Sequence, residues 1–317
     1  MKGFISPNLH PLKSLLLFFV FALAGLFIGS FLAVVLVKTI WGIGLMDIGD
    51  MLARPADYPE SRPALVLYQG VVHLVGFTVA ALAFLKVNAH RPLAFLSPRA
   101  TVPFYLLLGT VVLFLVIMPA ASWVVDWNAN VDFPDFMAGF ERWAKEKEEA
   151  LRQLTLELTK IESIPQLILG LFVFAVLPAI GEELVFRGIM QNELQRWWRN
   201  PHVAIWVAAF IFGAIHMQFY GMLPRMLLGV LFGYLYWWSG NLWVPIVGHF
   251  TNNGFMVLMM FLQQRGQIQL DIESTQASPW HLSLVSLGLT VGLLYVLYRA
   301  FRQHGAAAHG DVEPSRF

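Results

Sequence analysis

The stretch "LILGLFVFAVLPAIGEELVFRGIM", residues 167–190, places two carboxylates and an arginine inside an otherwise apolar segment. The segment exceeds the roughly 20 apolar residues that a helix needs to cross a hydrocarbon core about 30 Å thick. A charged side chain at the centre of such a span costs at least about 2.5–3.5 kcal/mol on insertion scales, so it usually faces a cavity or a partner. Glu182, Glu183 and Arg187 therefore mark a polar site within a membrane-spanning helix.

The composition of the whole chain supports a membrane protein. Hydrophobic residues make up 57% of its 317 residues and charged residues 13%, whereas soluble domains carry about 25% charged residues. The lipid bilayer is therefore its expected surroundings. The net charge of +1 provides no basic surface, and we expect no nucleic-acid partner. The chain has no cysteine, which excludes disulfides, thiolate metal sites and a cysteine nucleophile.

Apolar runs at eight places predict an all-α, polytopic integral membrane helix bundle with about eight transmembrane helices. These runs cover residues 14–37, 65–85, 103–125, 165 to the charged motif, 202–219, 222–238, 243–262 and 282–298. We divide the chain into three parts. Residues 1–162 hold three spans and a loop helix, residues 163–264 form the core that carries the polar motifs, and residues 265–317 hold the last span and a tail expected to be disordered.

Lysine and arginine in the loops predict the orientation of the helices. With both termini inside, the inner segments hold ten of these residues: Lys2, Lys13, Lys86, Arg91, Arg99, Arg196, Arg199, Arg299, Arg302 and Arg316. The short outer loops hold five: Lys38, Arg54, Arg62, Arg225 and Arg265. The long third loop is left out of this count. We therefore expect both termini in the cytoplasm, with the plasma (inner) membrane as the location.

The third loop is the one long polar segment between spans. Its stretch "ERWAKEKEEALRQLTLELTK", residues 141–160, combines strong helix formers with leucines three and four positions apart. It predicts an amphipathic helix that lies on the membrane or on the bundle. A lid that controls substrate access is the alternative.

The polar residues of the core show helical spacing. Glu183 and Arg187 are four residues apart and can pair along one face, whereas Glu182 lies about 100° round the helix and is left available as a general base or acid. His249 and Asn253 share a second helix face. In the fifth span, His216 is expected at about the depth of Glu182 in an antiparallel hairpin.

A further histidine, His73, lies in the second apolar run. We interpret it as an interhelical hydrogen-bonding group. The sequence does not identify its partner.

Three motifs in this core resemble those of the CAAX prenyl protease and bacteriocin-processing (CPBP, Abi) family of intramembrane proteases. "EELVFR" (182–187), "FGAIH" (212–216) and "HFTNN" (249–253) match the family patterns EExxxR, FxxxH and HxxxN in order, each in a membrane span. The resemblance covers about residues 165–262. It implies an intramembrane endopeptidase that acts on a membrane-associated peptide or protein.

The resemblance also implies roles for the matched residues. Glu182 activates the attacking water and His216 helps to hold it. His249 and Asn253 polarise the scissile carbonyl and stabilise its oxyanion, a contribution that is often large in acyl transfer. The other two motif residues, Glu183 and Arg187, fix the helix that presents Glu182.

The sequence leaves a metal cofactor open. Two histidines and a glutamate are a possible three-ligand set for a catalytic Zn²⁺. The usual HExxH helix is absent, however, and an asparagine suits an oxyanion donor better than a zinc ligand. The family has been described both as metalloproteases and as glutamate-dependent proteases, and we favour chemistry without a metal.

Two other functions and two substrate classes also stay open. A proton-coupled transporter would use glutamate and histidine in a relay, and a non-catalytic membrane scaffold would keep the fold alone. For a protease, the resemblance suggests prenylated CAAX-type C-termini, or bacteriocin and secreted-peptide precursors, as substrates.

Overall fold

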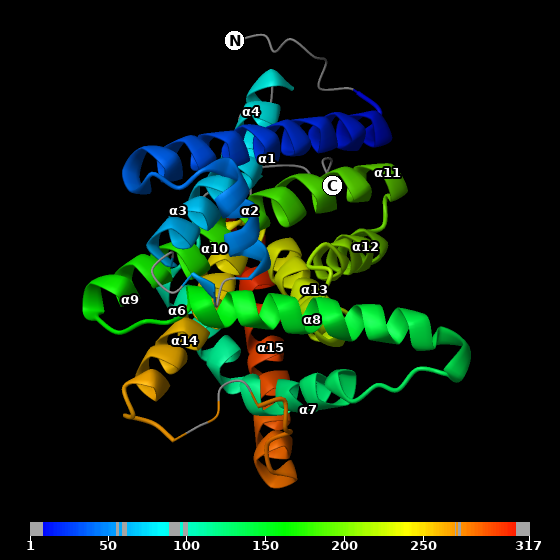
Figure 1. Cartoon of the computed structure of the whole chain (residues 1–317). Coiled ribbons are helices and arrows are strands. Elements are labelled where there is room, and N and C mark those ends of the chain that lie inside the picture. The colour runs from blue at the N-terminus through cyan, green and yellow to red at the C-terminus, as the bar shows by residue number, and fades with distance from the viewer. Residues whose placement is uncertain are drawn as a thin grey trace.

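The computed structural model describes residues 9–54, 57–58, 62–88, 96–97, 101–269, 271 and 274–308. Within these ranges every regular element is helical (Figure 1). Several of these helices are long and apolar enough to cross a membrane. The prediction of a polytopic all-α membrane protein is therefore confirmed.

The α-helices are α1 (Pro11–Trp41), α2 (Leu45–Ala53), α3 (Arg62–His73), α4 (Ala80–Val87), α6 (Phe104–Val116), α7 (Met118–Ala129), α8 (Ala138–Leu158), α9 (Ile164–Leu171), α10 (Leu177–Glu183), α11 (Asn192–Trp198), α12 (Pro201–Ala214), α13 (Met222–Ser239), α14 (Trp243–Gln264) and α15 (Trp280–Ala308). Three π-helical segments join some of them, namely η3 (Leu74–Val79), η5 (Phe172–Val176) and η6 (Leu184–Gln191). Two short 3₁₀ turns are η4 (Asp135–Met137) and η7 (Phe219–Gly221).

The number of spans differs from the predicted eight. All eight apolar runs contain helix, but five helices of the described chain are long and apolar enough to cross a membrane, or six if the bent pair α6 and α7 forms one span. The pair bends by 45°. α12 has 14 residues, a length of about 21 Å at 1.5 Å per residue, which is less than a hydrocarbon core about 30 Å thick.

The fourth predicted span forms the centre of the bundle. α9, η5, α10, η6 and α11 make one helix from Ile164 to Trp198, and it packs on η3, α12, α13 and α14. Its π-helical segments lie directly before and after the short helix α10. Such segments interrupt the regular i to i−4 hydrogen bonding and occur frequently at functional sites. The centre of this helix is therefore where a site is expected.

Glycine allows α12 and α13 to approach closely. A Cβ atom built on Gly213 would lie 2.9 Å from the carbonyl oxygen of Met222 and 3.2 Å from the amide nitrogen of Met226. Both are backbone atoms, so neither can turn aside as a flexible side chain can. This contact helps to fix the position of α12, at whose end the second motif lies.

We expect Gly213→Ala to lower the free energy of unfolding by about 1–3 kcal/mol, the usual cost of forcing extra atoms into a packed interior. The matched control is Gly288→Ala in α15, where an added Cβ would have no neighbour within 4 Å. Thermal unfolding of both variants in detergent tests the contact. Equal melting temperatures for the two would contradict it.

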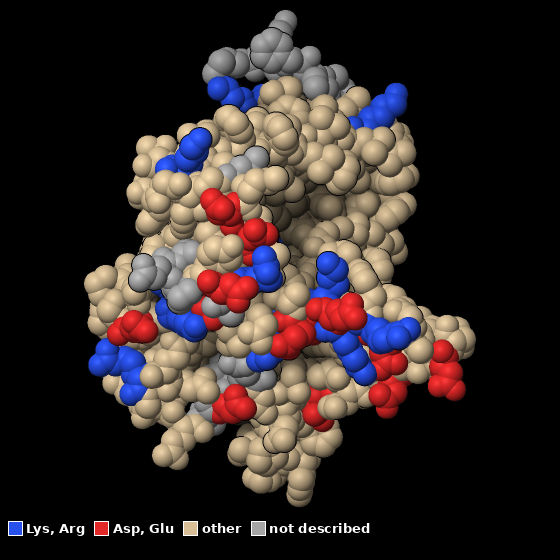
Figure 2. All heavy atoms as spheres, in the orientation of Figure 1, with Lys and Arg blue, Asp and Glu red and all other residues tan. Residues whose placement is uncertain are grey.

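The third loop forms the amphipathic helix predicted for it. α8 carries i,i+3 and i,i+4 ion pairs, including Lys145 with Glu141 and Arg152 with Glu149. Figure 1 shows α8 crossing the front of the molecule, and Figure 2 shows charged side chains gathered along it, below a hollow in the same face. On its inner side, Leu158 packs in a buried cluster with α1, α2 and α3. α8 therefore lies on the bundle with its charged face outward.

The tail that we expected to be disordered is "HGAAAHGDVEPSRF", residues 304–317. The structure corrects this in part, because α15 continues to Ala308. Three consecutive alanines, the strongest helix formers, follow Gly305 and extend the helix. Residues 309–317 lie outside the described residues.

Candidate active site

A buried ion pair joins two residues of the first motif. Arg187 Nη1 donates a 2.8 Å hydrogen bond to Glu183 Oε1, and the side chains of Arg187 and Glu183 are 1% and 0% exposed. Arg187 Nη2 donates to the carbonyl oxygen of Gly229 in α13 at 3.0 Å. The guanidinium also lies over the ring of Phe212, 4.7 Å from its centroid. The predicted pairing is confirmed, and it ties the central helix to α12 and α13.

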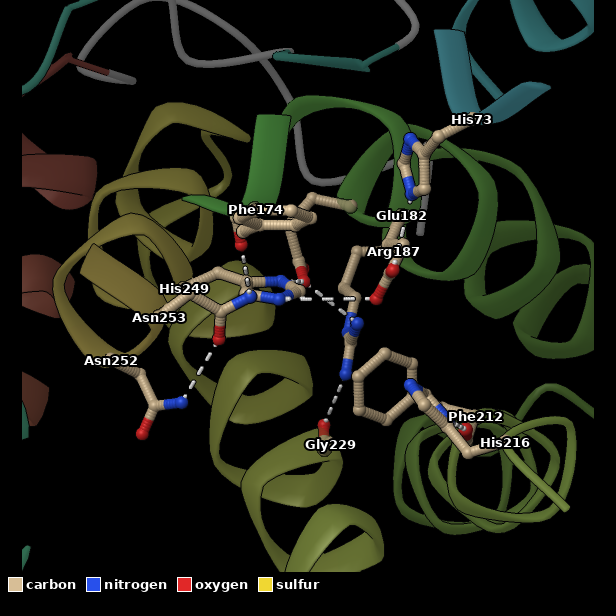
Figure 3. Close-up of polar contacts among 11 residues, drawn as sticks. His73, Phe174, Glu182, Arg187, Phe212, His216, Gly229, His249, Asn252 and Asn253 are labelled. Carbon is tan, nitrogen blue, oxygen red and sulfur yellow. Dashed lines mark hydrogen bonds and ion pairs between the residues drawn. The ribbon is translucent and has the colours of Figure 1, made fainter. Parts of the chain in front are cut away.

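The Glu182 carboxylate faces two histidines, His73 and His249 (Figure 3). Its Oε1 lies 3.2 Å from Nε2 of His73, and its Oε2 lies 3.8 Å from Nε2 of His249. The Glu182 side chain is 12% exposed. Glu182 is thus outside the arginine pair, as predicted, but its carboxylate is held between two imidazoles.

His249 connects the two glutamates. Its Nδ1 lies 2.8 Å from Glu183 Oε1, the oxygen that also accepts from Arg187. An ionised carboxylate only accepts hydrogen bonds, so Nδ1 carries a proton and Nε2 is directed at Glu182. The ring stacks on Phe232 at 4.9 Å. The orientation of the imidazole and its tautomer are therefore set by Glu183, as carboxylates do for many functional histidines.

His216 lies at the edge of this group. It follows the end of α12 in a turn, and its Nδ1 is 2.7 Å from the carbonyl oxygen of Phe212. Figure 3 shows the His216 side chain beside Phe212.

Asn253 contacts the backbone of the central helix. Its Nδ2 donates to the carbonyl oxygen of Phe174 at 3.2 Å, and its Oδ1 accepts from Asn252 Nδ2 at 3.1 Å. Phe174 belongs to the π-helical segment η5. Asn253 thus supports the backbone of the central helix and, in this conformation, donates no hydrogen bond toward Glu182.

The geometry does not bring a three-ligand zinc set together among the described residues. Among the described residues, no group of three or more His, Asp or Glu side chains is placed to hold a metal ion. The contacts of His249 and His216 use Nδ1 in each ring, and they leave Nε2 of both rings out of these bonds. We therefore derive no step through a metal.

His73 is the site residue that was absent from the predicted set. It was interpreted as an interhelical hydrogen-bonding group, and its partner proves to be Glu182, which lies 109 positions later in the chain. The available signal was a histidine in an apolar span. No helical spacing relates the two residues, since they belong to different helices.

Comparison with known proteins finds a family match for the central part of the chain. Residues 164–255 match the family model of type II CAAX prenyl endopeptidases, Rce1-like. The match lies within the predicted core of residues 163–264 and contains all three motifs. No solved structure matches the chain.

Three curated bacterial proteins are similar to parts of the chain. YpbD of Bacillus subtilis, named an uncharacterized protein, is 35% identical over 95 residues, which are 28% of this chain and 42% of YpbD. The putative membrane peptidase YdiL of the same organism is 31% identical over 119 residues, 38% and 46% of the two chains. The membrane-embedded CAAX protease MroQ of Staphylococcus aureus is 30% identical over 97 residues, 29% and 39%. The chain therefore spans less than half the length of each relative.

Proposed function

We propose that this integral membrane protein, whose residues 164–255 belong to the Rce1-like CAAX endopeptidase family, hydrolyses a peptide bond in a membrane-associated peptide or protein. The observation that carries the proposal is the position of Glu182 Oε2 opposite His249 Nε2, at 3.8 Å. This gap is too long for a direct hydrogen bond. A water molecule that bonds both groups fits such a separation.

The proposed reaction begins with that water. Glu182 takes one of its protons as the remaining hydroxyl attacks the scissile carbonyl carbon, so that one O–H bond breaks and one C–O bond forms. The carbonyl oxygen becomes negatively charged. When the C–N bond breaks, Glu182 returns the proton to the leaving amine.

His249 is the proposed donor to the oxyanion. With Nδ1 bonded to Glu183, a second proton on Nε2 makes the ring an imidazolium that points a donor into the site. A donor held in place before the reaction stabilises charge that develops in the transition state. Arg187, by holding Glu183, keeps the imidazole in position.

The remaining motif residues have supporting roles in this proposal. His216 helps to hold the attacking water, as the family resemblance implies. Asn253 holds the carbonyl of Phe174 and thereby the local shape of η5. When substrate binding releases the hydrogen bond from Asn253 to Phe174, the Asn253 amide becomes a second oxyanion donor, as the family resemblance implies.

The hollow above α8 is the proposed approach for the substrate (Figure 2). With α6 and α7 counted as one span, the spans number six among the described residues and both termini lie on the same side of the membrane. We propose that this side is the cytoplasm and that the protein lies in the plasma membrane. The substrate class is either a prenylated CAAX-type C-terminus or a bacteriocin or secreted-peptide precursor.

Purified wild-type protein in liposomes tests the function. One arm uses a fluorogenic farnesylated CAAX peptide, another the same peptide without the lipid, and a third a membrane-spanning precursor peptide, with products identified by mass. We expect cleavage of at least one peptide, and unchanged cleavage after treatment with a strong zinc chelator. Cleavage lost with the chelator and restored by Zn²⁺ would contradict the metal-free mechanism. Proton flux without cleavage of any peptide would instead favour a transporter.

A further inference from the structure

His73 contacts the proposed base from outside the region that matches the family. It ends α3, whereas the matched residues begin at Ile164. Its Nε2 lies 3.2 Å from Glu182 Oε1, and the His73 side chain is 8% exposed. A histidine of the second predicted span therefore supplies one of the two close polar contacts of the Glu182 carboxylate.

The packing around His73 holds its ring in one orientation. The ring stacks on Phe77 with a centroid distance of 4.5 Å and an angle of 6° between the planes. Gly181 lets the two helices come together here, since a Cβ atom at this position would lie 3.0 Å from His73 Cε1 and 2.9 Å from Phe77 Cβ. Stacking and close helix contact together direct Nε2 at Glu182.

The hydrogen-bond direction follows from the chemistry of the pair. An ionised Glu182 only accepts, so Nε2 of His73 is the donor. The other ring nitrogen, Nδ1, is buried and has no hydrogen-bond partner among the described residues. A polar atom left unpaired in a buried position lowers stability. His73 therefore keeps one ring nitrogen unpaired, which a role in packing alone does not explain.

The contact makes the two oxygens of Glu182 unequal. Oε1 accepts from His73, whereas Oε2 faces His249 across the 3.8 Å gap. We infer that His73 is a positioning residue that holds Oε1 of Glu182 and leaves Oε2 as the oxygen that takes the proton from water. This inference rests on the proposed function, to which it adds a residue outside the three motifs.

The test uses the full-length protein in liposomes, with the peptide that the wild type cleaves in the three-arm assay above. His73→Leu removes the donor. His73→Gln keeps one, because the side-chain amide nitrogen of glutamine can occupy the place of histidine Nε2. The control is His202→Gln at the start of α12, whose Nδ1 bonds the Tyr234 hydroxyl away from the site.

We expect His73→Leu to lower kcat by about 10–100-fold, the usual effect of losing a group that orients a functional side chain. KM should stay within about twofold, because the buried His73 acts in this proposal on Glu182 and not on the substrate. His73→Gln should recover most of kcat, because it keeps a donor to Glu182. His202→Gln should behave as wild type. Should His73→Leu not fold, His73→Asn replaces it, since its amide is too short to reach Glu182.

Two results would overturn the inference alone. One is a kcat for His73→Leu equal to that of the wild type. The other is an equal loss of kcat in His73→Leu and His73→Gln together with a raised KM in both. That combination would indicate distorted packing. Absence of cleavage by the wild type would contradict the proposed function itself, and the inference would fall with it.

Discussion

Glu182→Gln is expected to lower the rate of peptide cleavage by about 10²–10⁴-fold, the range for loss of a general base. Glutamine has nearly the same shape as glutamate, and its carbonyl oxygen still accepts a hydrogen bond from His73. It cannot take a proton from water, however. The variant should therefore bind substrate and keep its melting temperature while turnover is lost, which steady-state cleavage and thermal unfolding in the same liposomes or detergent would measure.

The matched control is Glu193→Gln. Glu193 lies on the same continuous helix and is 1% exposed, but it pairs with Arg196 at 3.2 Å and takes no part in the proposed site. This control should cleave at the wild-type rate. A Glu182→Gln variant as active as Glu193→Gln would remove Glu182 as the base.

Arg187→Ala is expected to lower the free energy of unfolding by about 3–5 kcal/mol, because it leaves the carboxylate of Glu183 buried without its charged partner. The change also removes the hydrogen bond to Gly229 and the contact with the Phe212 ring. Thermal or denaturant unfolding in detergent measures the effect. Cleavage should fall as well, since Glu183 orients His249.

A double variant separates charge from packing. Glu183→Gln combined with Arg187→Met replaces the ion pair by uncharged side chains of similar size. Replacing a buried pair in this way is often neutral or stabilising, so the double variant should regain much of the stability lost by Arg187→Ala. It should stay poorly active, because His249 loses its carboxylate partner. A melting temperature of Arg187→Ala equal to that of the wild type would contradict a structural ion pair.

The helical fold was predictable because apolar length is a strong signal. Each apolar run contains a helix, and α8 appears where the leucine spacing placed it. The span count was less predictable. The sequence does not reveal that α12 ends after 14 residues, or that α6 and α7 meet at a bend of 45°. These features arise from packing between helices.

The site was predictable where its residues share one helix. The spacing of Glu183 and Arg187 determined their contact directly. Contacts between helices were not predictable, as with His73 and Glu182. The bond from Asn253 to the Phe174 carbonyl could not be foreseen either, because no pattern in the sequence indicated the π-helical segment that contains Phe174.

The central claim is that Glu182 and His249 act as one unit on a single water and the carbonyl it attacks. Cleavage rates of Glu182→Gln, His249→Ala and the double variant, measured in one liposome preparation beside the wild type, test it most directly. Residues that act as a unit have strongly non-additive effects, so the double variant should be about as slow as the slower single variant. The claim would be contradicted if the fold-reduction in the cleavage rate of the double variant equalled the product of the two single fold-reductions. Cleavage at the wild-type rate by either single variant would also contradict it.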